Sequence, residues 1–255
     1  MSQKNLSTRS CFSNSPHLST KHSSYFDTYD RLLSEYCGKP ITFLEIGVLN
    51  GGSLFMWREF FGPSARIIGV DLNPAAKKWE EFGFEIYVGS QTSPDFWSKV
   101  ISEVGEIDVV LDDGGHTYEQ QVVTVETLIE HVKDGGKLIV EDTHTSYMKG
   151  FGPRRYSFIE YTKNLMDRIN HRSSQISLKE PEFRIWSIEV FESIVSFLVK
   201  RDASQSESQS VTNERPEVFE VDFRFGEPKS WQRRLNKLKA KLGWKFLFSY
   251  TNYFK

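Results

Sequence analysis

The stretch LEIGVLNGGS, residues 44–53, joins an apolar run to three glycines and a serine. The apolar run predicts a buried strand at Ile41–Ile46, and the glycines after it predict a tight turn. A helix is expected next, at Ser53–Phe61. Glycines between a strand and a helix let a ligand approach the backbone and leave the helix N–H groups exposed. The stretch therefore predicts the first strand–turn–helix unit of an α/β fold, with a ligand site at its turn.

The alternation of strand and helix continues on the C-terminal side of this unit. Further strands are expected at Arg66–Val70, Phe84–Val88, Ile107–Leu111 and Lys137–Val140, and further helices at about Pro74–Glu81, Pro94–Val104 and Tyr118–Val132. Five strands that alternate with helices argue for a parallel sheet covered by helices on both faces. Two more helices are expected outside this series, at Tyr25–Tyr36 and Arg154–Ile169.

Two more strands are expected after these units, at Phe183–Val190 and Ser193–Lys200. The connection between them is too short for a crossover, so this pair must be antiparallel. The predicted fold class is α/β: a Rossmann-like, doubly wound, seven-stranded and mostly parallel sheet with a C-terminal antiparallel strand. The domain that holds this sheet is expected to span residues 21–201.

The segments around this domain differ from it in composition. Residues 1–20 are rich in Ser, Thr and Asn and are expected to be disordered. A polar loop is expected at 202–217, and a basic, aromatic tail at 218–255. From Lys229 onward the tail holds eight Lys or Arg and no Asp or Glu, which leaves 24 basic against 34 acidic residues in the rest of the chain.

The overall composition is typical of a globular protein in water. The 255 residues include 38% hydrophobic and 26% charged side chains, and the formal net charge of −2 argues against a nucleic-acid binder. Cys11 and Cys37 form neither a metal-binding spacing nor a disulfide framework, which indicates a reducing compartment. No apolar run reaches the ~18 residues of a membrane span, and the N-terminus lacks the apolar centre of a secretory signal. A cytoplasmic location is therefore expected.

The glycine turn differs from the turn that binds dinucleotides. A dinucleotide site carries G-x-G-x-x-G, whereas the pattern here is Glu45-x-Gly47-x-x-x-Gly51-Gly52. The acidic Glu45 suits a cationic ligand better than a diphosphate. Asp71 ends the second strand, where a carboxylate can accept hydrogen bonds from both hydroxyls of a ribose. The alternative interpretation is a tight turn, with Asp71 capping the next helix.

Two acidic pairs follow the fourth and fifth strands: Asp112 with Asp113, and Glu141 with Asp142. The carboxyl ends of parallel strands meet at one edge of the sheet, where open α/β sheets bind ligands. Four carboxylates that lie so close would raise one another's pKa unless a cation sits among them. Hard oxygen ligands favour Mg²⁺, with Mn²⁺ or Ca²⁺ as alternatives. The alternative interpretation involves no ion: the two aspartates are capping residues, and His116 is a histidine at the start of a helix.

The motifs LEIGVLNGGSL, IIGVDLN, YVGSQ, DDGGH and IVEDTHTSY resemble those of class I S-adenosylmethionine-dependent methyltransferases. From roughly Lys21 to Lys200 the chain resembles more narrowly the metal-dependent O-methyltransferases that modify sugars of macrolide antibiotics, and the related cephalosporin hydroxylase-like proteins. DDGGH followed by EDT is the specific part of this resemblance. The chain departs from the family at Gly115, where relatives commonly carry Ser, and in its basic tail, which has no counterpart there.

The resemblance implies a magnesium- and S-adenosylmethionine-dependent O-methyltransferase. Asp113, Glu141 and Asp142 would hold the ion, and His116 would be the general base, with Asp113 beside it at the catalytic centre. Asp112 and Asp113 can exchange roles in this assignment. Cofactor contacts would come from the glycine turn, the strand ends and the loop after the third strand: Glu45, Gly47, Gly51, Asp71, Gln91 and Asp112.

The chemistry of such a reaction fits these residue types. Methyl transfer from a sulfonium needs a nucleophilic oxygen, and an unactivated hydroxyl ionises near the ~15.7 of bulk water. A divalent cation lowers that value, and a histidine, which normally titrates near ~6.5, can accept the proton. His144 and Tyr147 are candidates for an acceptor pocket. His22, Tyr25 and Tyr29 would either cover the site or belong to the core.

The predicted partner is a hydroxylated small molecule, a sugar or another natural product, and no nucleic acid is expected. A homo-oligomer is also considered, as is peripheral membrane contact through the basic tail; docking of the tail on the acidic body or on a second subunit is the alternative. Alternative functions with the same fold are a hydroxylase-like protein, a non-catalytic partner protein and a membrane-associated module. The missing G-x-G argues against a nicotinamide-dependent oxidoreductase.

Overall fold

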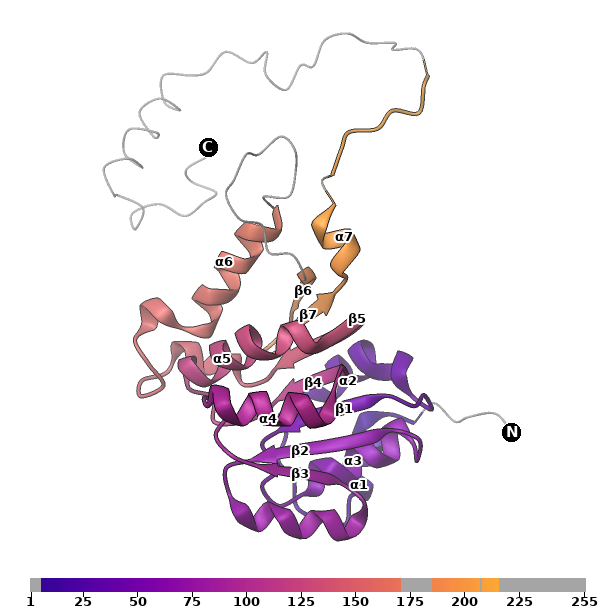
Figure 1. The fold of residues 1–255 in the computed structure, drawn as a ribbon, viewed down its shortest axis with the longest axis vertical. Coiled ribbons are helices and arrows are strands. Elements are labelled where there is room, and N and C mark those ends of the chain that lie inside the picture. The colour runs from indigo at the N-terminus through magenta and orange to yellow at the C-terminus, as the bar shows by residue number, and fades with distance from the viewer. Residues whose placement is uncertain (1–5, 171–184, 207, 216–255) are drawn as a thin grey trace. The chain divides into compact units, whose positions relative to one another are not determined.

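A seven-stranded sheet forms the centre of the protein (Figure 1). The structure is a computed structural model, and it describes residues 6–170, 185–206 and 208–215. The strand order is β3-β2-β1-β4-β5-β7-β6. The strands are β1 (Thr42–Ile46), β2 (Arg66–Asp71), β3 (Glu85–Val88), β4 (Ile107–Asp112), β5 (Val132–Val140), β6 (Ile185–Val190) and β7 (Val195–Val199).

The direction of the strands follows the prediction. The first five strands pair in parallel, and β7 is antiparallel to both β5 and β6. β6 therefore runs in the direction of the first five, and β7 is the one reversed strand of this sheet. The turn between β6 and β7 is closed by a hydrogen bond from the Phe191 N–H to the Ile194 carbonyl at 2.8 Å. The predicted mostly parallel, seven-stranded sheet with a C-terminal antiparallel strand is confirmed.

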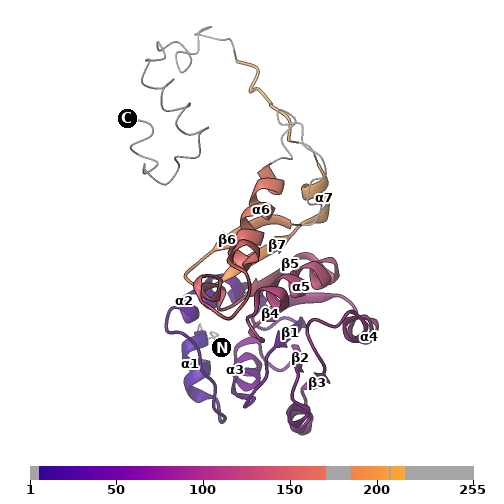
Figure 2. The same cartoon turned by 90° about the vertical axis from the view of Figure 1, so that its left-hand side faces the viewer.

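Helices cover both faces of the sheet (Figure 2). The α-helices are α1 (Thr8–Asn14), α2 (Tyr25–Leu33), α3 (Gly52–Phe61), α4 (Pro94–Val104), α5 (Tyr118–Leu128), α6 (Phe158–Asn170) and α7 (Arg201–Gln205). The first three pack into one core with Phe43 and Val109, while α4, α5 and α6 pack into a second core with Leu44 and Val110. Neighbouring residues of a strand enter opposite cores because successive strand side chains point to opposite faces.

Short 3₁₀ helices complete the fold, and they account for several differences from the predicted elements. They are η1 (Ser34–Tyr36), η2 (Pro74–Phe82), η3 (Ile129–His131), η4 (Thr143–Tyr147) and η5 (Arg154–Tyr156). The helix predicted from Pro74 is thus a 3₁₀ helix. The helix predicted from Arg154 begins at Phe158, because the Ser157 hydroxyl accepts the Glu160 N–H at its start. The helix from Tyr118 ends at Leu128, since Val132 already belongs to β5.

The prediction that residues 1–20 are disordered is wrong for the part that the structure describes. Ser7 caps α1 by accepting the Ser10 N–H, and Cys11 is completely buried against the core. The Thr8 N–H donates to Asp30 of α2 at 2.8 Å. This helix therefore packs as an integral part of the fold, and residues 1–5 lie outside the described residues.

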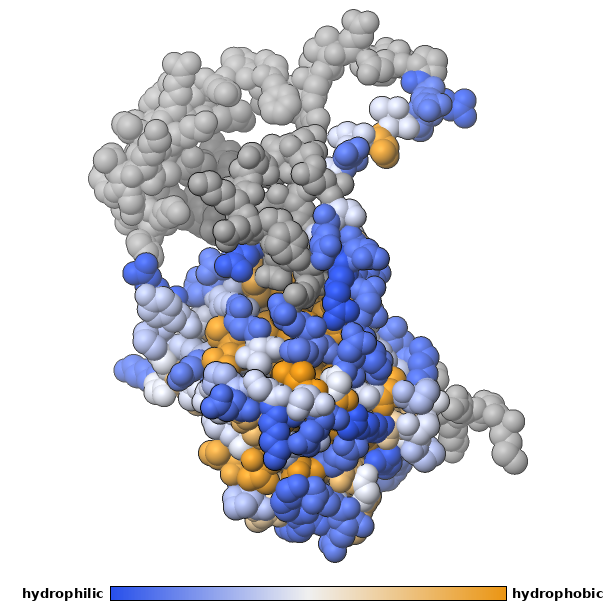
Figure 3. Space-filling model, viewed as in Figure 1, coloured by the Kyte–Doolittle hydropathy of each residue, from blue (hydrophilic) through white to orange (hydrophobic). Residues whose placement is uncertain are grey.

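The C-terminal boundary also differs from the prediction. Helix α7 occupies the beginning of the segment 202–217 that was expected to be a loop, and the chain divides into two units after Gln209. The aromatic tail of 218–255 lies outside the described residues. No helix in the described ranges is long and apolar enough to cross a membrane. In the view of Figure 1, Figure 3 shows hydrophilic side chains over most of the coloured surface, with apolar ones between them.

Candidate active site

The predicted site residues lie at the carboxyl ends of neighbouring strands. Ile46 of β1 is in register with Asp112 of β4, and Asp112 is in register with Val140 of β5. The backbone ladder continues one residue further, because Asp113 N–H donates to Ile46 and Glu141 N–H donates to Asp112. The parallel register therefore brings the two acidic pairs together at one edge, beside the glycine turn.

The glycine turn is packed directly against this acidic edge. Gly47 has a φ of +94°, and a Cβ there would lie 2.1 Å from the backbone oxygen of Asp113, so no larger residue fits. Gly51 has a φ of +77° and precedes α3. Below the turn, Glu45 is fully buried and accepts hydrogen bonds from the Ser53 hydroxyl and the Trp57 indole at 2.8 and 3.1 Å. Burial raises the pKa of Glu45 to about 7, although the nearby Lys21 opposes this.

Asp71 closes the glycine turn from the second strand. Its Oδ2 accepts the N–H groups of Val48 and Leu49 at 2.9 and 2.8 Å, and its Oδ1 accepts the Asn73 N–H at 2.8 Å. A carboxylate oxygen offers two acceptor positions, so Oδ1 keeps one free. Leu49 and Leu72 flank Asp71 and are 80% and 73% exposed. The end of β2 thus combines a carboxylate with two apolar side chains that are open to a ligand.

Gln91 and Asp112 are buried and bonded to each other. The Gln91 amide donates to both Asp112 oxygens at 3.2 and 3.3 Å and accepts the Gly115 N–H at 2.9 Å. Burial raises the pKa of Asp112 to about 6. These bonds hold the turn after β4 and direct Asp112 away from the second acidic pair, so Asp113 is the aspartate that faces it. Contact of Gln91 and Asp112 with a cofactor stays a prediction.

Asp113, His116 and Asp142 form a compact group of possible metal ligands. One ligand atom from each lies within 4.8 Å of the others. The His116 Nε2 is 3.3 Å from Asp142 Oδ2 and 3.9 Å from Asp113 Oδ1. His116 and Asp142 have φ values of 58° and 53°, in the left-handed region that side chains seldom occupy. With these backbone conformations the side chain of His116, after β4, and the side chain of Asp142, after β5, face each other.

Glu141 was predicted to bind a metal ion together with Asp113 and Asp142, but its carboxylate lies outside the group that these two form with His116. It belongs to no three-residue ligand group within the described part of the chain, and its carboxylate is fully buried. Two tyrosines one turn apart on α2 bind the acidic pair: the Tyr29 hydroxyl donates to Glu141 and the Tyr25 hydroxyl to Asp142, each at 2.5 Å. Burial and the charge of Asp113 raise the pKa of Glu141. These tyrosines are core residues and site residues at once.

Lys21 is a site residue that the sequence did not predict. Its Nζ lies 2.7 Å from Asp113, 3.0 Å from Glu141 and 4.0 Å from Glu45, and its side chain is 1% exposed. Burial alone would lower the pKa of Lys21, but the three carboxylates outweigh it and raise the pKa. A lysine in a Ser- and Thr-rich segment carries no periodic signal that would have identified it.

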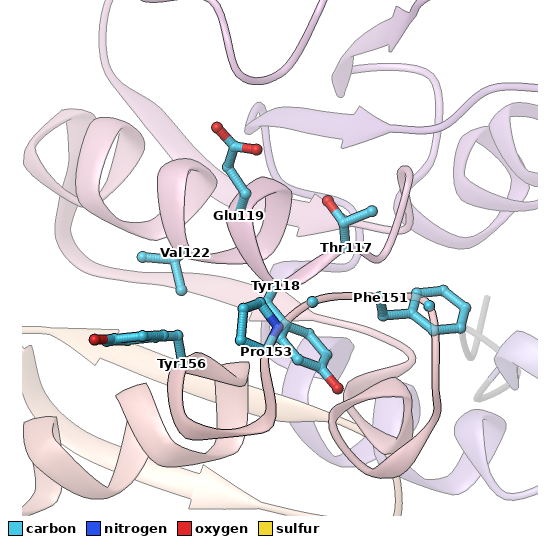
Figure 4. Close-up of a pocket in the computed structure, with 9 residues that line it drawn as sticks. Thr117, Tyr118, Glu119, Val122, Phe151, Pro153 and Tyr156 are labelled. Carbon is cyan, nitrogen blue, oxygen red and sulfur yellow. The ribbon is translucent and has the colours of Figure 1, made fainter.

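One cavity lies at this centre, and a second lies at the start of α5. The first, of about 120 Å³, is lined by Thr20, Lys21, His22, Tyr25, Asp113, Glu141 and Asp142. The second, of about 440 Å³, has Thr117, the residue after His116, in its lining. Figure 4 shows Tyr118 and Pro153 between Phe151 and Tyr156 in its lining. The His116 carbonyl accepts the Thr145 hydroxyl at 3.1 Å, which ties the helix start to the loop after β5.

The remaining predicted residues lie nearer the surface. His22 and His144 flank Asp142, each with a ring nitrogen 3.8 or 3.9 Å from its Oδ1. The His144 ring also contacts the Ser193 hydroxyl. Tyr147 is 68% exposed and stands clear of the acidic group.

Residues 44–143 match a protein family described as a methyltransferase domain. The glycine turn and the acids at the ends of β2, β4 and β5 lie within this matched segment, whereas β6 and β7 lie beyond it.

Two curated relatives of this chain are named as O-methyltransferases. The chain is 32% identical over 186 residues to mycinamicin VI 2''-O-methyltransferase of Micromonospora griseorubida, covering 64% of this chain and 46% of that relative. It is 32% identical over 157 residues to demethylmacrocin O-methyltransferase of Streptomyces fradiae, covering 56% and 39%. The chain thus spans less than half the length of these two relatives.

A solved structure matches the methyltransferase fold over most of the chain. The MycE methyltransferase from the mycinamycin biosynthetic pathway, in complex with Mg and SAH, is 26% identical with a TM-score of 0.70. The match covers 85% of this chain and 59% of that protein. A second structure of MycE, which also contains mycinamycin VI, matches equally well with a TM-score of 0.70.

Proposed function

We propose that the protein is an S-adenosylmethionine- and Mg²⁺-dependent O-methyltransferase that acts on a hydroxyl of a sugar or other small-molecule natural product. The observation that carries this proposal is the convergence of Asp113, His116 and Asp142 beside the glycine turn of a methyltransferase domain. The relatives that methylate sugars, and the MycE structures with Mg, SAH and mycinamycin VI, support it.

The acidic residues fit a divalent ion chemically. Asp113 and Asp142 would hold the ion with carboxylate oxygens, and Glu141 lines the same 120 Å³ cavity. Hard oxygen ligands of this kind suit Mg²⁺, and also Mn²⁺ or Ca²⁺. A divalent ion bound there would lower the pKa of the acceptor hydroxyl and fix its direction.

His116 is the proposed general base. Its Nε2 lies 3.3 Å from Asp142, whose carboxylate would stabilise the imidazolium after proton uptake. The Thr145–His116 hydrogen bond and the capping box between Thr117 and Gln120 hold the backbone on both sides of the ring. The larger cavity, which has Thr117 in its lining, offers aromatic side chains to the apolar body of an acceptor.

The cofactor would lie across the ends of β1 and β2. Asp71 keeps one acceptor position for a ribose hydroxyl, and the exposed Leu49 and Leu72 can cover the apolar faces of the adenosine. The turn that Gly47 and Gly51 shape with their positive φ values would hold its methionine part. The buried carboxylate of Glu45 would complement the cationic sulfonium.

The proposed activity is tested by incubating the full chain with S-adenosylmethionine and mycinamicin VI and by analysing the products by mass spectrometry. We expect one methyl group on the sugar, no product in excess chelator, and recovery of activity when Mg²⁺ is added back. Undiminished turnover in excess chelator would contradict the metal requirement. Failure to bind S-adenosylhomocysteine in calorimetry would contradict the methyltransferase function itself.

A further inference from the structure

The ammonium group of Lys21 lies inside the acidic centre. Its side chain is 1% exposed, and it enters from the short segment that precedes α2. Lys21 and Asp113 are separated by 92 residues in the chain, and Lys21 and Glu141 by 120. A buried ammonium is costly unless carboxylates and hydrogen bonds compensate for its lost hydration. The surrounding oxygens provide that compensation.

The oxygens around Lys21 form a cage like that of a cation site. The Nζ donates to Asp113 Oδ2 at 2.7 Å and to both oxygens of Glu141 at 3.0 and 3.2 Å. Glu45 Oε1 lies 4.0 Å away on the side of the glycine turn. Carboxylates from the carboxyl ends of β1, β4 and β5 thus surround one nitrogen, as they would a metal ion.

Asp113 joins this cage to the His116–Asp142 side of the centre. Its Oδ2 accepts from Lys21, while its Oδ1 lies 3.9 Å from the His116 ring. Glu141 is engaged by Lys21 and Tyr29, and Asp142 by Tyr25. The acidic centre therefore has two halves that share Asp113: one half surrounds Lys21, and the other faces His116.

The four carboxylates of the two halves are balanced by Lys21, one divalent ion and the sulfonium of the cofactor. When ionised, Glu45, Asp113, Glu141 and Asp142 supply four negative charges, and Lys21 supplies one positive charge. A divalent ion and the sulfonium of the cofactor would add the remaining three. Carboxylate clusters of this kind can otherwise hold two divalent ions ~3.5–4 Å apart.

We propose that Lys21 is a positioning residue that takes the place of a second divalent ion and keeps the metal centre mononuclear. Its ammonium supplies one positive charge among Glu45, Asp113 and Glu141, and it holds Asp113 Oδ2 so that Oδ1 stays available on the His116 side. This role rests on the divalent-ion requirement of the proposed function. Lys21 would thus exclude a hard divalent cation from the position that its ammonium group occupies.

The test is the number of Mn²⁺ ions that the full chain binds, measured by calorimetry and by electron paramagnetic resonance. We expect one ion per chain for the wild type and two for Lys21→Ala, with a spectrum of two coupled ions. Lys21→Arg keeps the charge and is expected to bind one. Lys137→Ala is the matched control, because Lys137 is also buried and bonded, to Leu32 and Glu35, outside the site.

The outcomes separate this inference from the proposed function. One ion in both the wild type and Lys21→Ala would overturn the role of Lys21 and leave the metal requirement intact. Two ions in Lys21→Arg would overturn it as well, because the charge would then not matter. A wild type that binds no Mn²⁺ would overturn both proposals. Because Lys21→Ala can destabilise the fold, its melting temperature is measured with and without Mn²⁺; we expect Mn²⁺ to raise it more than in Lys137→Ala, and an equal rise would count against the proposal.

Discussion

At the residue scale, His116 is the side chain whose geometry bears most directly on the proposed reaction. Its Nε2 faces Asp142 at 3.3 Å, and its Nδ1 is buried without a partner in the described ranges. We expect His116→Ala to lower turnover by roughly 10²–10⁴ while the affinity for S-adenosylhomocysteine stays unchanged, because a general base contributes to the chemical step alone. Single-turnover kinetics and calorimetry measure the two quantities.

His131→Ala is the control for this prediction. His131 ends η3 just before β5 begins, at the opposite end of that strand from Asp142, so its loss should change turnover far less. Wild-type turnover of His116→Ala at neutral pH would show that the acceptor hydroxyl ionises without this histidine.

The sequence predicts some residues of this site and could not predict others. Asp113, Glu141 and Asp142 could be predicted because they end strands whose parallel pairing is itself predictable. Lys21 could not, because it reaches Glu141 across 120 residues from a segment with no distinctive motif. The grouping of Asp113 with His116 and Asp142, rather than with Glu141, depends on side-chain partners that strand order does not determine.

At the element scale, the strands were predicted more accurately than the helices. Buried strands give short apolar runs bounded by turns, and all seven occur near their predicted positions, although β5 begins at Val132 rather than at Lys137. The nine residues of η2 have an apolar spacing that fits either kind of helix, and the difference between them lies in hydrogen bonds that the pattern does not report. The seven residues of α1 contain only Cys11 and Phe12 as apolar side chains, too few for a periodic signal.

The packing of α1 predicts a protected thiol. Cys11 is fully buried, and burial, with the charge of Glu59, raises its pKa to about 12. A thiol with so high a pKa has almost no thiolate at neutral pH, and the thiolate is the reactive form. We expect iodoacetamide to modify the partly exposed Cys37 first, and Cys11 only when the protein unfolds.

The Cys37→Ser variant isolates this measurement. Mass spectrometry should find no modified thiol in the native variant and one in urea. Equal rates of Cys11 modification in buffer and in urea would mean that α1 is not docked, and would restore the original expectation of disorder for this segment.

At the scale of the whole molecule, the charges are strongly segregated along the sequence. The net charge of −2 conceals the eight basic residues from Lys229 onward, which leave an excess of acidic over basic residues in the remainder. Part of that excess belongs to the acidic centre, where Glu45, Asp113 and Glu141 surround Lys21 and Asp142 faces His116. The basic tail itself lies outside the described residues, so its role has to be argued from the sequence alone.

The sequence of the tail predicts binding to an anionic surface. Trp231, Leu235 and Leu238 recur at helical spacing among Lys and Arg residues, and the residues from Trp244 to Phe254 add aromatic side chains that suit a membrane interface. Each basic residue near an anionic bilayer contributes about 1 kcal/mol, so several would hold the protein reversibly. We expect the full chain to sediment with phosphatidylserine vesicles at low salt, and deletion of residues 229–255 to abolish this.

A variant with the tail's Lys and Arg changed to Gln separates charge from aromatic insertion. If the full chain stays in the supernatant at low salt, the tail docks on the acidic body or on a second subunit, and sedimentation equilibrium with and without the tail distinguishes these two cases.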